Sequence, residues 1–133
     1  MAENTMVKEQ LTGAMIDAGA ELTTKLDEMG LRVTAAFWLF VPELNEWRLQ
    51  FASPDVSTRG PREVYEKIRL AIDQLGAKAA VPLSIIGVLD AEEDLVRLLK
   101  LAIRTGPGIS RIRFSKNVLN GHFIDDALIY RAV

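Results

Sequence analysis

The sequence predicts an α+β domain with the element order α-β-β-α-β-α-β-β, in which a largely antiparallel sheet of about five strands has helices packed on at least one face. Two observations predict this fold. Apolar residues recur at three- and four-residue steps in several segments, as they do in amphipathic helices. Alternating apolar residues and turn signals mark strands and two hairpins. We expect residues 1–133 to form a single domain.

The composition is that of a protein with an ordinary hydrophobic core. Hydrophobic residues make up 49% of the chain and charged residues 26%, and no apolar run approaches the length of a membrane-spanning helix. The absence of cysteine excludes disulfides, thiol nucleophiles and cysteine-ligated metal centres. The amino-terminal residues show no secretory signal, so we expect a cytoplasmic protein without a membrane partner.

The first helix is expected from about Thr5 to Met29, where apolar side chains recur on one face. Gly30 follows the last apolar position and favours the left-handed backbone that commonly ends a helix. Gly13 and Gly19 lower the helix propensity inside this segment, but small residues also permit close packing. We expect the helix to cover the core face of the sheet, with a dimerisation role as the alternative.

Residues 31–53 are the most informative stretch, because they predict a hairpin whose two arms differ. In the first arm both sets of alternating side chains are apolar, so both faces of that strand need a cover. In the second arm Arg48 and Gln50 alternate with apolar residues, which is typical of a half-buried strand.

The pairing of the two arms decides which side chains share a face. With a loop from Pro42 to Glu46, Phe40 would lie opposite Arg48, and Trp38 would lie opposite Gln50. This register predicts a face on which two aromatic rings lie beside a guanidinium and an amide. A loop one residue shorter would reverse the parity of the pairing and remove that face.

The middle of the chain predicts a helix, a strand and a further helix. Pro61 opens a helix after a polar connecting loop, and Gly76 ends it. The apolar run 83–89 is expected to form a buried central strand. Asp90 is then expected to cap the next helix, with Glu93 completing a capping box.

The last segment predicts a second hairpin around the turn Asn120-Gly121. Counting outward from this turn places Ile112 opposite Ile129 on one face and Arg113 opposite Leu128 on the other. A bulge in the returning strand would shift this count.

Motifs for catalysis, cofactors and metals are not found in the sequence. Gly106-Pro107-Gly108 follows a helix, and the negative end of the helix dipole repels phosphate. His122 is the only histidine, and an ordinary surface hairpin explains His122, Asp125 and Asp126 better than a metal site does. We therefore predict no catalytic residues, no metal site and no cofactor; the sequence favours a non-catalytic protein, and a catalytic site assembled from distant residues is a question for the three-dimensional structure.

We expect a small non-catalytic protein-interaction module, acting as a homo-oligomer or as a subunit of a larger complex. The predicted binding residues are Trp38, Phe40, Arg48 and Gln50, because tryptophan, phenylalanine and arginine are enriched at the centres of interfaces. If helices instead covered both faces of the sheet, Trp38 and Phe40 would be core residues without a functional role.

The alternative is an accessory nucleic-acid-binding protein that uses the same face. Its aromatic rings would stack on bases, and phosphates would be contacted by Arg48, Arg104, Arg111, Arg113 and Lys116. Four of these cations lie in a basic stretch without Asp or Glu, although folding can bring acidic residues from elsewhere beside it and cancel its field. The run from Phe37 to Pro54 also resembles small bacterial proteins without an assigned activity, which implies no roles for its residues.

Overall fold

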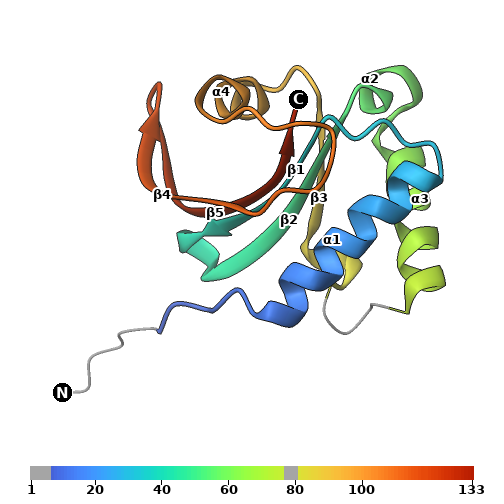
Figure 1. Cartoon of the computed structure of the whole chain (residues 1–133), viewed down its shortest axis with the longest axis horizontal. Coiled ribbons are helices and arrows are strands. Elements are labelled where there is room, and N and C mark those ends of the chain that lie inside the picture. The colour runs from blue at the N-terminus through green and yellow to red at the C-terminus, as the bar shows by residue number, and fades with distance from the viewer. Residues whose placement is uncertain (1–6, 77–80) are drawn as a thin grey trace.

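The computed structural model describes residues 7–76 and 81–133. The strands form one five-stranded sheet in the order β3-β2-β1-β5-β4 (Figure 1). The pair β2–β3 is parallel and the other neighbours are antiparallel, so the sheet is mixed rather than wholly antiparallel. The α+β class and the approximate helix order agree with the sequence. The elements are α1 (Gly13–Glu28), β1 (Ala35–Val41), the 3-10 turn η1 (Pro42–Leu44), β2 (Glu46–Ser53), α2 (Asp55–Arg59), α3 (Pro61–Leu75), the 3-10 turn η2 (Leu83–Ile85), β3 (Ile86–Asp90), α4 (Asp94–Ala102), β4 (Ile112–Leu119) and β5 (His122–Ala132).

Helices cover both faces of the sheet. One face packs against α1 and α3 and includes Trp38, Phe51 and Tyr130 in its core. The other face curves around α4 and includes Phe37, Leu99 and Ile129 (Figure 1). Because β1 is apolar on both sides, it contributes to both cores.

The first helix begins later than the sequence predicted. It starts at Gly13, and the hydroxyl of Thr12 caps it by accepting a hydrogen bond from Met15 N at 3.1 Å. Residues 7–12 precede it without helical or strand structure, and the predicted start at Thr5 lies outside the described residues. The hydroxyl cap of Thr12 and the low helix propensity of Gly13 outweigh the apolar periodicity of the preceding residues.

Two other boundaries differ from the expectations. The predicted central strand over residues 83–89 is β3, which is shorter and lies at the edge of the sheet, paired with β2 alone. Asp90 ends β3 rather than capping a helix, and α4 starts at Asp94 after Glu93, without a side-chain hydrogen bond at the cap. The polar connector before Pro61 also contains the short helix α2.

The register of the first hairpin is shifted by one residue from the predicted one, which reverses the faces of the second strand relative to the first. Val41 pairs with Glu46, so the connection is one residue shorter than expected, and Asn45 takes the left-handed conformation with φ 48°. Phe40 therefore lies opposite Trp47, and Trp38 lies opposite Leu49.

The second hairpin has the predicted register. Ile112 pairs with Ile129 and Arg113 pairs with Leu128, as counted from Asn120-Gly121. Lys116 has a φ of 51° and interrupts the alternation of β4 without changing the count. A two-residue turn fixes the register because it leaves the strands no other pairing.

Candidate functional site

The predicted aromatic face does not exist, because Trp38 and Phe40 are buried by the chain's own elements. Trp38 is fully buried, and its Nε1 donates a hydrogen bond to Tyr130 Oη at 2.8 Å. Tyr130 Oη donates in turn to the carbonyl of Ile16 in α1 at 2.6 Å, and burial raises the pKa of Tyr130 to about 12. Phe40 is 6% exposed. These two aromatic residues are core residues, as the alternative of helices on both faces anticipated.

Arg48 and Gln50 lie on the opposite face of the sheet from Trp38 and Phe40. Arg48 forms an ion pair with Glu46 of the same strand at 2.7 Å. Gln50 lies opposite Phe37 of β1 and packs against Gly87 of β3. The four residues predicted to bind a partner are therefore not brought together on one face.

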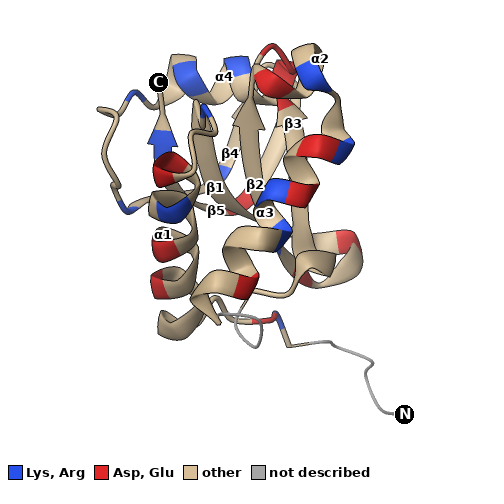
Figure 2. Ribbon diagram, turned by 90° about the vertical axis from the view of Figure 1, so that its right-hand side faces the viewer, with Lys and Arg blue, Asp and Glu red and all other residues tan. Residues whose placement is uncertain are grey.

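Folding pairs most of the predicted phosphate-binding cations with carboxylates. Arg111 lies 3.0 Å from Asp17, Arg113 lies 2.6 Å from Asp126, and Lys116 lies 3.3 Å from Asp125. Arg48 is likewise paired, and Arg104 is exposed after the end of α4. Figure 2 shows cations and carboxylates interspersed on α1 and α3 rather than gathered on separate faces. The basic stretch in the sequence therefore does not become a continuous basic surface.

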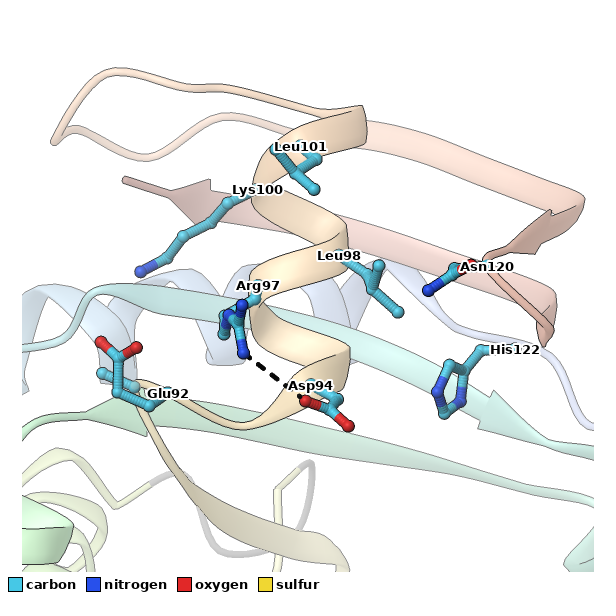
Figure 3. A pocket seen from close by; sticks show the side chains of 9 residues that line it. Glu92, Asp94, Arg97, Leu98, Lys100, Leu101, Asn120 and His122 are labelled. Atoms are coloured by element: carbon cyan, nitrogen blue, oxygen red, sulfur yellow. Dashed lines mark ion pairs between the residues drawn. The ribbon is translucent and has the colours of Figure 1, made fainter.

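A groove of about 450 Å³ lies between α4 and the tip of the β4–β5 hairpin. Leu98 and Asp94 lie on the side of α4 that faces Asn120 and His122, whereas Arg97 and Lys100 lie along the other flank of the helix (Figure 3). Leu101 also lines the groove and is 82% exposed.

A second groove adjoins the first and shares His122 with it. It lies between the end of β1 and the start of β5, where Leu95 and Phe123 are among its lining residues, and Phe123 is 58% exposed. The two grooves share His122, and we call their lining together the hairpin-tip surface, defined by Leu95, Leu98, Leu101, His122 and Phe123; charged residues of α4 also line the first groove.

On the opposite face of the sheet, the amino-terminal segment 7–12 lies over an aromatic pair. The rings of Phe40 and Trp47 have centroids 5.4 Å apart and planes tilted by 56°. Trp47 Nε1 donates to the carbonyl of Glu9 at 2.8 Å. The side-chain amide of Asn45 donates to the carbonyl of Val7 at 3.1 Å and accepts from Glu9 N at 2.9 Å.

The ammonium group of Lys8 lies between these rings and two carboxylates. It is 4.6 Å from the centroid of Phe40, 2.9 Å from Asp125 Oδ2 and 3.0 Å from Asp126 Oδ2. Partial burial lowers the pKa of Lys8, but the hydrogen bonds to both carboxylates outweigh burial and leave the pKa raised. For Asp126, burial disfavours the charged carboxylate and so raises the pKa. Hydrogen bonds from Arg113, Lys8 and Ser115 outweigh burial and hold the pKa of Asp126 well below its ordinary value.

This cluster was not predicted from the sequence. Lys8 fell in the expected first helix, and Asp125 and Asp126 were considered only as metal ligands. The signal that was present is Thr12-Gly13, since a hydroxyl cap before a glycine indicates a helix start and frees the preceding residues for other contacts.

The residues that the structure describes contain no group of three or more His, Asp or Glu side chains placed to hold a metal ion. Within residues 7–76 and 81–133, no helix has the length and apolar character needed to cross a bilayer. No protein-family model, curated protein or solved structure matches this chain.

Proposed function

We propose that this chain is a small non-catalytic protein-interaction module that self-associates through the hairpin-tip surface. The observation that carries the proposal is the exposure of large apolar side chains there, 82% for Leu101 and 58% for Phe123. Soluble monomers rarely leave neighbouring apolar residues uncovered, and such surfaces mark sites of association.

The helix at the centre of this surface is apolar on two sides. Val96 and Leu99 of α4 are buried against the sheet. Leu98 and Leu101 lie outside that contact and line the groove instead. A helix that is apolar on more than its core face is normally covered on its other side as well. A partner would supply that cover.

The charges around the groove favour a second copy of the chain as this partner. The same groove carries the carboxylates of Glu92 and Asp94 and the cations of Arg97 and Lys100. A two-fold interface brings a surface against itself, and charges of both signs around an apolar centre allow each charge to meet its opposite on the partner. This surface carries both signs, with Arg97 lying 3.7 Å from Asp94 of the same chain.

Nucleic-acid binding is supported less well. Four of its five predicted cations lie within 4.0 Å of a carboxylate, which reduces the charge available to phosphates. The aromatic rings assigned to base stacking are buried. Titration of the protein with a single-stranded oligonucleotide at low salt is expected to show no salt-sensitive binding.

Size-exclusion chromatography with light scattering, repeated over a wide range of protein concentrations, tests self-association by measuring the molar mass of the eluting protein. We expect the unmodified chain to form a dimer, and Leu101→Glu or Phe123→Glu to weaken it. Losing the burial of one such side chain costs about 2 kcal/mol, and each substitution changes both copies, so dimerisation should weaken by about 4 kcal/mol and the dissociation constant should rise roughly 700-fold. Leu70→Glu is the matched control, because Leu70 is 45% exposed on α3 in the opposite layer. An unmodified chain that stays monomeric, or a dimer that survives both substitutions, would contradict the proposal.

A further inference from the structure

The amino-terminal contact on the other face of the sheet is a second site, and Phe40 lines both this site and the second groove. We propose that Phe40, Trp47, Asp125 and Asp126 form a binding site for a lysine ammonium group, which Lys8 occupies within the chain and which a lysine in an extended segment of a partner protein occupies in its place. We call these four residues the lysine cage.

The cage matches the chemistry of a primary ammonium group. The nitrogen of Lys8 has three donors, and the carboxylates of Asp125 and Asp126 accept from it at 2.9 and 3.0 Å. The rings of Phe40 and Trp47 lie 4.6 and 5.7 Å from the nitrogen, where the negative faces of aromatic rings attract a cation. Charge and ring faces therefore converge on one position.

The cage keeps its shape through contacts that do not involve Lys8. Asp126 accepts hydrogen bonds from Arg113 Nε at 2.7 Å and Arg113 NH2 at 2.6 Å, and from Ser115 Oγ at 2.9 Å. Asp125 accepts from Lys116 at 3.3 Å. Trp47 packs in the core of its face, and the guanidinium of Arg113 lies 5.5 Å from the centroid of its ring. Departure of one ammonium group therefore leaves the carboxylates and rings in place.

Beside the cage, Asn45 and Trp47 form hydrogen bonds with the main chain of the segment that carries the lysine. Asn45 donates to the carbonyl of Val7 and accepts from the N–H of Glu9, which are the groups on either side of Lys8. Trp47 Nε1 donates to the carbonyl of Glu9. Every peptide offers these main-chain groups, so only the lysine side chain is specified. The ligand class is a peptide segment with one lysine, whose main chain is held by the side chains of Asn45 and Trp47.

The occupant within the chain is held mainly by polar contacts at the surface. The side chain of Lys8 is 41% exposed, and Val7 is 82% exposed. Because Lys8 reaches the surface while its two carboxylate partners stay largely covered, an equivalent segment is able to approach from solvent and displace Lys8. Attachment to the same chain gives Lys8 a high effective concentration, so the partner segment competes against it.

Nuclear magnetic resonance of the two tryptophan indoles tests the proposal in the full chain. The variant Lys8→Ala/Glu9→Pro releases residues 7–12 without changing the four cage residues. It removes the ammonium group of Lys8 and the N–H of Glu9, which donates a hydrogen bond to Asn45. The probes are the capped peptide acetyl-VKEQL-amide and the same peptide with norleucine in place of its lysine. Trp47 reports on the site, and Trp38, bonded to Tyr130, reports on the fold.

We expect the lysine peptide to shift the Trp47 indole resonance of the variant while the Trp38 resonance stays unchanged. The norleucine peptide should bind at least about tenfold more weakly, because it lacks the charge. The unmodified chain should also bind the lysine peptide at least about tenfold more weakly, because Lys8 competes. Equal affinities of the two peptides, equal affinities of the two chains, or an unshifted Trp47 would overturn the proposal. Lys8→Ala alone gives the same comparison if the double variant unfolds.

Discussion

Replacing Gly19 with alanine tests the packing that buries Trp38. Gly19 lies inside α1, where alanine would ordinarily stabilise a helix by about 1 kcal/mol. A Cβ at this position would collide with Tyr130 Oη and lie 2.9 Å from Trp38 Nε1. These two groups are hydrogen bonded to each other, and Tyr130 Oη is also bonded to the carbonyl of Ile16. The added methyl group therefore has to displace a buried hydroxyl that both accepts and donates a hydrogen bond.

The opposing free energies favour destabilisation. Overpacking a core costs about 1–3 kcal/mol, and disrupting a buried hydrogen bond costs a further ~1–3 kcal/mol. The gain in helix propensity offsets about 1 kcal/mol of this. We expect Gly19→Ala to lower the free energy of unfolding by about 2–3 kcal/mol. At Gly13 no atom lies within 4 Å of an added Cβ, so Gly13→Ala should be neutral or stabilising.

Urea denaturation of the two alanine variants and of the unmodified chain measures this difference. Tyr130→Phe provides the second arm of a double-mutant cycle, because it removes the oxygen that the new Cβ meets. Gly19→Ala should cost at least about 1 kcal/mol less in that background. If Gly19→Ala proved as stable as Gly13→Ala, the reasoning about close packing of α1 on the sheet would be refuted.

Two further predictions concern charged residues. Asp27→Ala should lower the free energy of unfolding by about 2–3 kcal/mol, because it leaves a buried guanidinium without its carboxylate partner. Arg131 is 5% exposed and donates to Asp27 at 2.8 and 2.9 Å. Glu28→Ala is the control, and equal denaturation midpoints for the two variants would contradict this prediction. The folded-state pKa values of Asp125 and Asp126 lie below the ordinary 3.8, so their contribution to stability is present above that pH and is lost as the pH falls below it. Asp126→Asn should therefore flatten the fall in urea midpoint below about pH 4, and an unchanged slope would argue against it.

Local sequence patterns predicted the elements better than their pairing. Apolar periodicity and terminal glycines identified α3 and its end at Gly76, and Asn120-Gly121 gave the register of β4 and β5. The first hairpin lacks such a turn. Its connection combines a 3-10 turn with a left-handed Asn45, and the shorter loop exchanges the faces of β2 relative to β1. One residue of loop length thus decided whether Trp38 was assigned to a surface or to the core.

The lysine cage could not be predicted from spacing, because its members are distant in sequence. Lys8 and Asp125 are separated by 117 positions, and no local pattern links them. Periodicity also assigned residues 7–12 to a helix, since Val7 and Leu11 fit the apolar stripe. Only the three-dimensional arrangement shows that this segment crosses the sheet and places an ammonium group between the rings.

The central strands β1 and β5 pair with each other although they are far apart along the chain. Trp38 and Tyr130, which are bonded across β1 and β5, are separated by 92 positions. During synthesis β1 therefore emerges long before the strand that completes it, and contacts between such distant segments form slowly. Residues Ala35–Val41 are apolar on both faces and carry no charge. In a nascent or unfolded chain, this segment is therefore open to intermolecular β-pairing until the distant strand β5 covers it.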